Sequence, residues 1–117
     1  MLTNSARQAI ELFNRYITAW NHRDADLIRY MMTPEVFLTD WEISVQGRDS
    51  VVAANGDIWI NVPDIIIHVD DVFYCENNNT VIGKLTVQSK KQEFKINVID
   101  IVKFEHGKIS SVEAYKQ

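Results

Sequence analysis

The chain has 117 residues, the length of one domain, and it has the composition of a folded protein, with 46% hydrophobic and 24% charged residues. Its net charge of −4 excludes the basic surplus that binding to nucleic acid needs. The single cysteine, Cys75, excludes an internal disulfide and a cysteine-based zinc site, and favours a reducing, cytoplasmic location. The polar start of the chain and its short apolar stretches predict neither a secretion signal nor a membrane span.

The first expected helix covers residues 5–22. Its apolar residues recur at steps of three and four, the spacing of one buried helical face. They are Ala6, Ala9, Ile10, Phe13, Ile17 and Trp20. Ser5 and Gln8 have the spacing of a capping box, so we expect this helix to begin at Ser5.

Two further helices and an extended stretch are expected next. The second helix should begin at the cap Asp24 and end at Thr33, because the residue before Pro34 avoids helical backbone. Residues 36–46 are rich in β-branched and aromatic types, which predicts one or two extended segments. The third helix should cover about residues 49–61.

The remaining residues alternate between apolar and polar types and are broken by three turns. This pattern predicts four antiparallel strands, near 65–75, 80–88, 93–104 and 108–116. Helices followed by a meander of long strands are typical of an α+β fold, in which helices cover one face of a curved antiparallel sheet. We therefore expect one domain over residues 1–117.

Asp100 interrupts an otherwise apolar row on the expected strand 93–104. The period of two places it on the same face as Phe94, Ile96, Val98, Val102 and Phe104. Burial in such surroundings raises the pKa of a carboxyl group, which can then stay protonated and donate a hydrogen bond or act as a general acid. The structural alternative is a buried aspartate that is satisfied by a neighbouring hydroxyl or backbone N–H.

Two other residues are weaker candidates. Asp40 shares a face with Val36 and Leu38 near the end of an extended segment, where an aspartate commonly serves a turn. Tyr16 lies on or beside the buried face of the first helix, and its hydroxyl therefore needs a partner. Tyrosines in such positions are mostly core residues.

These residues and the order of the elements resemble a known family. Residues 14–40 are similar to the opening of the ketosteroid isomerase-like, or SnoaL-like, branch of the nuclear transport factor 2-like (NTF2-like) superfamily. Residues 98–104 resemble its penultimate strand, and residues 104–115 resemble its last hairpin. The resemblance implies a cystatin-like cone, in which three N-terminal helices pack on a curved antiparallel sheet around an apolar pocket.

The resemblance also implies an activity and a site. Asp40 would be the general base, and Tyr16 and a protonated Asp100 would donate hydrogen bonds to an enolate oxygen, the arrangement known for ketosteroid isomerase. The reaction would be proton transfer next to a carbonyl in a small apolar, steroid- or polyketide-like ligand, without a cofactor. The residues expected around this ligand are Trp20, Phe37, Trp59, Val98, Val102 and Phe104.

Two alternatives to an isomerase-type enzyme remain open. The domain could be a non-catalytic module that binds a ligand or dimerises, or a dehydratase or cyclase that uses the same pocket. Short patterns of a helix and an aspartate recur among superfamily members with all of these functions.

The three histidines do not suggest a metal site. His22, His68 and His106 lie on a helix end, a strand and a turn without the spacing of metal ligands. His68 shares a face with Val72 and Tyr74, so it lies either inside the cone or on the outer surface of the sheet.

A homodimer is expected through the outer face of the sheet. On strand 93–104, the face opposite Asp100 carries Ile99 and Ile101 within a polar row that also contains charged residues. A twofold contact between sheets would cover both side chains, and the family resemblance implies such dimers.

Overall fold

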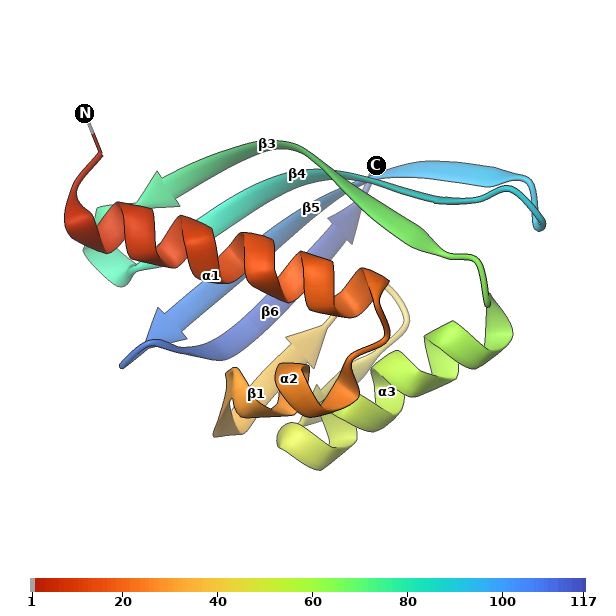
Figure 1. The fold of residues 1–117 in the computed structure, drawn as a ribbon, viewed down its shortest axis with the longest axis horizontal. Coiled ribbons are helices and arrows are strands. Elements are labelled where there is room, and N and C mark those ends of the chain that lie inside the picture. Colours follow the sequence, from red (N-terminus) through yellow and green to blue (C-terminus); the bar gives the residue numbers. More distant parts are fainter. Residues whose placement is uncertain (1) are drawn as a thin grey trace.

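The computed structural model describes residues 2–117, which form three α-helices, one short 3-10 helix and six strands (Figure 1). In chain order these are α1 (Asn4–Asn21), α2 (Ala25–Tyr30), β1 (Met32–Thr39), β2 (Ser44–Gln46), α3 (Arg48–Asn61), β3 (Ile66–Cys75), η1 (Glu76–Asn78), β4 (Thr80–Ser89), β5 (Phe94–Glu105) and β6 (Lys108–Lys116). The six strands form one sheet in the order β2-β1-β6-β5-β4-β3. The expected α+β architecture is confirmed.

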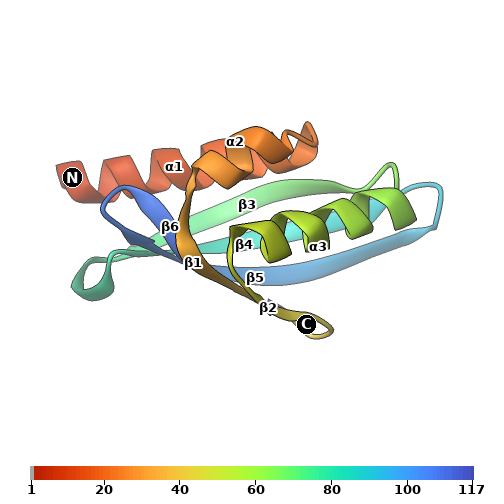
Figure 2. The same ribbon diagram turned by 90° about the horizontal axis from the view of Figure 1, so that it is seen from below.

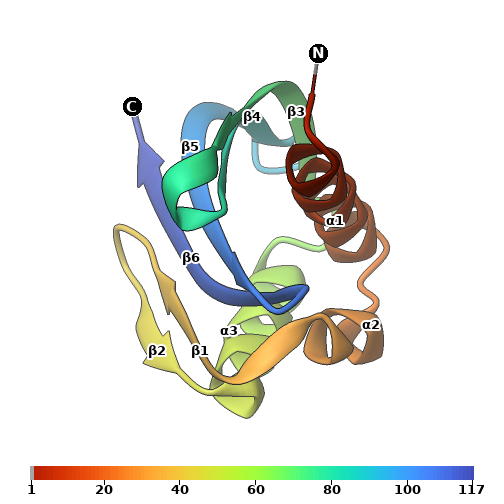
Figure 3. The ribbon, with the colours of Figure 1, turned by 90° about the vertical axis from the view of Figure 1, so that its left-hand side faces the viewer.

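The sheet is a curved wall, and the helices lie on its concave side (Figures 2 and 3). In Figure 3, α1 lies beside β3 at one end of the wall, and α3 lies beside β1 near the other end. The four strands expected after residue 64 form an antiparallel meander, β3 to β6. β1 runs parallel to β6, a pairing that local patterns did not indicate.

The first helix begins differently from the expectation. Its N-cap is Thr3, whose Oγ1 accepts a hydrogen bond from the backbone N–H of Ala6 at 3.0 Å. Ser5 lies inside the first turn, so the expected capping box is wrong. Thr3 supplies the side-chain acceptor that the exposed N–H groups of a helix start require.

The second helix has the expected cap and an earlier end. Asp24 Oδ1 accepts from the backbone N–H of Leu27 at 3.2 Å, as the cap of α2. The helix ends at Tyr30, not at Thr33, because the residues from Met32 onward form strand β1 of the sheet. The carbonyl of Met31 accepts from the N–H of Ile109 on β6 at 2.7 Å, and this bond commits the following residues to β1.

The core lies between the helices and the concave face of the sheet. Phe13 of α1 is fully buried, and burial of such a side chain contributes about 1.5–3 kcal/mol. Its ring lies against Gly83 of β4, where a Cβ atom would collide with the ring. The glycine therefore lets α1 approach the middle of the sheet. None of the helices within residues 2–117 has the length and apolar character that a membrane crossing requires.

Candidate active site

The strand register brings two aspartates into one row on the concave face. Asp100 of β5 pairs with Gly83 of β4 on one side and with Ala114 of β6 on the other. In the parallel pair, Thr39 of β1 is opposite Glu113 of β6, so Asp40 follows beside Ala114. Along the sheet, only the methyl side chain of Ala114 separates the two acidic residues.

Asp100 is the buried acid that the apolar row predicted. It is 7% exposed and lies between the buried residues Val98 and Val102 on the inner face of β5. Burial, followed by the negative charge of Asp40, raises the pKa of Asp100 from its ordinary 3.8 to about 7. At neutral pH a substantial fraction of molecules therefore carries a protonated Asp100, which can donate a hydrogen bond.

Tyr16 faces the same region from α1. Its side chain is 3% exposed. The pKa of Tyr16 is raised well above its ordinary value. Burial is the larger cause, and the negative charge of Asp100 is the smaller one. Tyr16 therefore keeps its proton at physiological pH and is available as a donor.

Asp40 has the turn role that the sequence left open as an alternative to a catalytic one. Its Oδ1 accepts from the backbone N–H groups of Glu42 and Ile43, both at 2.7 Å. Its own N–H donates to the carbonyl of Ile43 at 2.8 Å, which closes the turn between β1 and β2. Because both side-chain bonds use Oδ1, the turn holds the carboxylate in place and leaves Oδ2 free to accept a proton.

Trp20, four residues after Tyr16 on α1, contacts Asn55 and Trp59 of α3. Trp20 Nε1 donates to Asn55 Oδ1 at 3.1 Å, and both side chains are buried. The rings of Trp20 and Trp59 meet edge to face, with 5.7 Å between centroids. Sequence reasoning missed Asn55, although it lies four residues after the buried Val51, a polar residue on an apolar helical face.

The other expected ligand-contacting residues do not all share this region. Val98, Val102 and Phe104 are buried on the inner face of β5. Phe37 is 47% exposed on the outer face of β1, which corrects the expectation that it faces the interior. The buried neighbours Val36 and Leu38 occupy the inner face, so alternation along the strand turns Phe37 outward.

His68 lies on the outer surface of the sheet and not inside the cone. A β-bulge between Val69 and Asp71 adds one residue to β3, which reverses the faces of the residues before it relative to those after it. Val72 therefore packs against the core, whereas His68 is exposed and contacts Gln88. Among residues 2–117, no group of His, Cys, Asp or Glu side chains could hold a metal ion.

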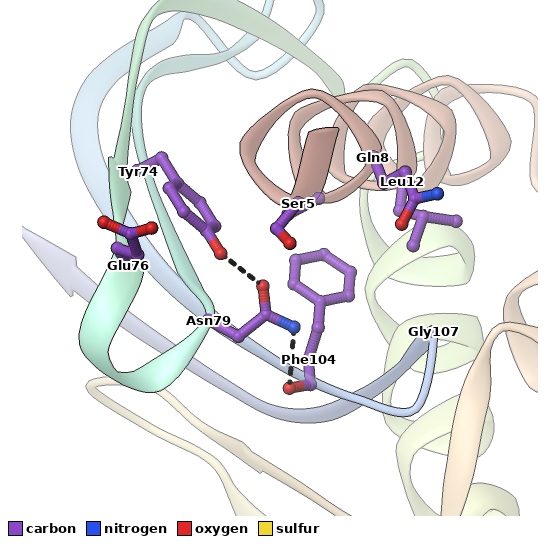
Figure 4. Close-up of a pocket in the computed structure, with 9 residues that line it drawn as sticks. Ser5, Gln8, Leu12, Tyr74, Glu76, Asn79, Phe104 and Gly107 are labelled. Atoms are coloured by element: carbon purple, nitrogen blue, oxygen red, sulfur yellow. Dashed lines mark hydrogen bonds between the residues drawn. The ribbon is translucent and has the colours of Figure 1, made fainter. Parts of the chain in front are cut away.

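Two hollows in the described structure lie elsewhere. One, of about 250 Å³, follows the N-terminal half of α1 (Figure 4). There Tyr74 donates from its hydroxyl to Asn79 Oδ1 at 2.7 Å, and Asn79 Nδ2 donates to the carbonyl of Phe104 at 3.3 Å. The other, of about 660 Å³, is an open depression over the outer surface of β1 and β6. Neither is lined by Tyr16, Asp40 or Asp100, so neither is the expected apolar pocket.

Comparison with known sequences decides the family. Residues 13–112 match the SnoaL-like domain family, which covers most of the chain. The chain belongs to the SnoaL-like domain family. No curated protein sequence matches this SnoaL-like domain.

Solved structures confirm the fold of this SnoaL-like domain. A putative SnoaL-like polyketide cyclase from Jannaschia Sp. CCS1 has a TM-score of 0.87 at 14% identity, covering 100% of this chain and 90% of that chain. A putative ketosteroid isomerase from Kribbella flavida DSM 17836 has a TM-score of 0.81 at 13% identity, with coverage of 95% and 78%. An NTF2-like protein of unknown function from Cytophaga hutchinsonii ATCC 33406 has a TM-score of 0.79 at 14% identity, with coverage of 93% and 89%. At these identities the likeness establishes the NTF2-like fold.

Proposed function

We propose that this SnoaL-like domain is an enzyme that moves a proton at a carbon next to a carbonyl, without a cofactor. The observation that carries the proposal is the buried Asp100, whose pKa is raised to about 7 beside Asp40 and Tyr16. A protonated acid and a neutral tyrosine provide two donors, and a fixed carboxylate provides one base. Enolate chemistry needs this combination of groups.

The proposed reaction conserves the charge of the site. Asp40 Oδ2 takes a proton from the carbon next to the carbonyl, and the electron pair of the broken C–H bond forms the enolate. Tyr16 and Asp100 donate hydrogen bonds to the enolate oxygen, where the negative charge of Asp40 has moved. Asp40 then returns the proton to carbon. Burial and, as the smaller cause, the charge of Asp40 raise the pKa of Asp100 and so favour its protonated form before the reaction.

The substrate class follows from the surroundings of these groups and from the structural neighbours. The inner face around Asp100 carries apolar side chains, among them Val98 and Val102, which suit an apolar ring system. Two of the similar structures are a putative polyketide cyclase and a putative ketosteroid isomerase. We therefore propose a small steroid- or polyketide-like ketone. Neither of these two hollows is lined by Tyr16, Asp40 or Asp100.

The test is exchange of carbon-bound hydrogen for deuterium in a panel of cyclic ketones, followed by NMR. Asp40→Asn should slow exchange by about 10²–10⁴-fold, because it removes a positioned base. Asparagine keeps the Oδ1 acceptor that the turn uses, so the fold should survive. Asp26→Asn removes the same charge on the exposed surface of α2 and should leave exchange unchanged. Equal exchange by wild-type and Asp40→Asn protein across the panel would refute the proposal.

The second candidate is a non-catalytic binding module. It is favoured by the two hollows, which avoid Tyr16, Asp40 and Asp100. For such a module, a ketone would bind to the wild-type protein and to Asp40→Asn equally, and neither protein would exchange its protons.

We also propose that the SnoaL-like domain forms a homodimer through the outer face of the sheet. Phe73, Ile82 and Ile101 are cross-strand neighbours on this face, and Phe73 is 54% exposed. Ile99 and Tyr115 form the next row, and both are exposed. The register therefore joins apolar side chains of four strands into one patch, which a twofold contact would cover.

A further inference from the structure

Two buried hydrogen-bond donors on α3 have no partner in the described part of the chain. They are Asn55 Nδ2 and Trp59 Nε1. A buried donor without a partner is unfavourable, and the large majority of buried polar groups are paired. Two such donors side by side therefore need an explanation, and neither belongs to the proposed proton transfer.

The orientation of the Asn55 amide is determined by its neighbour. Its Oδ1 accepts from Trp20 Nε1 at 3.1 Å, and an indole nitrogen can only donate. Rotating the amide by half a turn would place its NH₂ group against that indole N–H and leave both donors unsatisfied. Nδ2 is therefore the free group of Asn55, in a side chain that is only 3% exposed.

Trp59 supplies a second donor on the same side of the helix. Residues 55 and 59 are four positions apart on α3, so their side chains are neighbours on one helical face. The edge-to-face contact of the Trp59 ring with Trp20 restricts the position of the ring. Trp20 therefore restricts the positions of both free donors, because it orients the Asn55 amide and packs on the Trp59 ring.

The chemistry of the two donors defines what they would bind. Both are neutral and neither accepts a hydrogen bond, so the matching group is a hydrogen-bond acceptor. A carboxylate or phosphate would find no counter-charge in these two side chains, and burying an unpaired charge is unfavourable. A carbonyl or ether oxygen satisfies both donors without burying a charge.

The position of the pair relative to Tyr16 defines where this oxygen lies. Trp20 follows Tyr16 by four residues on α1, so it lies about one helical turn, roughly 6 Å, farther along the same face. Asn55 and Trp59 both contact Trp20. A ligand whose reacting carbonyl meets Tyr16 and Asp100 would present its second oxygen on the order of 6–10 Å away.

We propose that Asn55 and Trp59 form a second oxygen site, which selects ligands that carry a neutral carbonyl or ether oxygen distant from the reacting carbonyl. The placement of the reacting carbonyl rests on the proposed function, whereas the second site rests on the two donors alone. The preferred substrates are therefore diketones, keto esters or keto lactones rather than simple ketones.

The test compares two probes that differ by one oxygen, trans-decalin-2,6-dione and trans-2-decalone. Calorimetry with the wild-type protein should show about tenfold tighter binding of the dione, equal to about 1.4 kcal/mol, because its second oxygen accepts two hydrogen bonds. Trp59→Phe keeps an aromatic ring and removes the indole donor. It should reduce this preference several-fold, because it should weaken binding of the dione more than binding of 2-decalone.

NMR of the wild-type protein provides a measurement that depends on no variant. The dione should shift the indole proton of Trp59 and the side-chain amide protons of Asn55 downfield, and 2-decalone should not. Equal affinity for both probes, no binding of either, or a resident water that contacts these protons with the dione bound would overturn the second site. Equal weakening of both probes by Trp59→Phe would show a structural role instead.

The outcomes separate this inference from the proposed function. Binding is measured in the Asp40→Asn background as well, where turnover is absent if Asp40 is the base. Proton exchange without preference for the dione would refute only the second site. Preference for the dione without proton exchange in any ketone would refute only the proposed reaction.

Discussion

Replacing Asp100 by asparagine should change how the stability of the fold depends on pH. The unfolded carboxyl has a pKa of 3.8 and the folded one about 7, so between these values the native state holds more protons than the unfolded chain. Stability therefore falls as pH rises through this window, by at most about 1.36 kcal/mol per pH unit. The increase of the pKa from 3.8 to about 7 corresponds to a total loss of about 4 kcal/mol in unfolding free energy. Asp100→Asn cannot ionise, so it should lack this loss.

Urea unfolding at pH values from 4.5 to 8 measures the effect. As the pH rises, the unfolding free energy of the wild type should fall relative to that of Asp100→Asn. This change should level off above about pH 7. Asp40→Asn should lower the pH at which the wild-type loss levels off only in part, since burial is the larger cause of the raised pKa. A difference that stays constant with pH would refute the reasoning, as would an NMR titration of Asp100 near 3.8.

Three further outcomes follow from the structure. Tyr16→Phe should keep the fold and lower proton exchange by about 10²–10³-fold, measured as above; an unchanged rate would remove its role as a donor. Gly83→Ala should lower the unfolding free energy by about 1–3 kcal/mol or more, since a Cβ collides with the Phe13 ring, and a second change, Phe13→Leu, should recover part of the loss in urea titrations. Sedimentation equilibrium should show a dimer that Ile99→Lys with Ile101→Lys dissociates, whereas a wild-type monomer of 13.5 kDa at tens of micromolar would contradict the interface.

Local patterns were sufficient for most of the elements and for the central acid of the site. Helical and strand periodicities depend on neighbours within a few residues, so they located all three helices and the four strands of the meander to within a few residues. The apolar row around Asp100 correctly indicated its burial, because alternation on an unbroken strand is a local property.

Interactions between distant segments decided the remaining features. The end of α2 depends on a bond from Ile109, and the outward position of His68 depends on a bulge in the pairing of β3 with β4. Asn55 is oriented by Trp20, 35 residues away in the sequence. Strand register, bulges and buried polar contacts are set by which segments pair across the sheet and the core, and this pairing has no period within a single segment. The sequence by itself therefore determined the elements and the buried acid, and only the tertiary structure decided which side chains meet it.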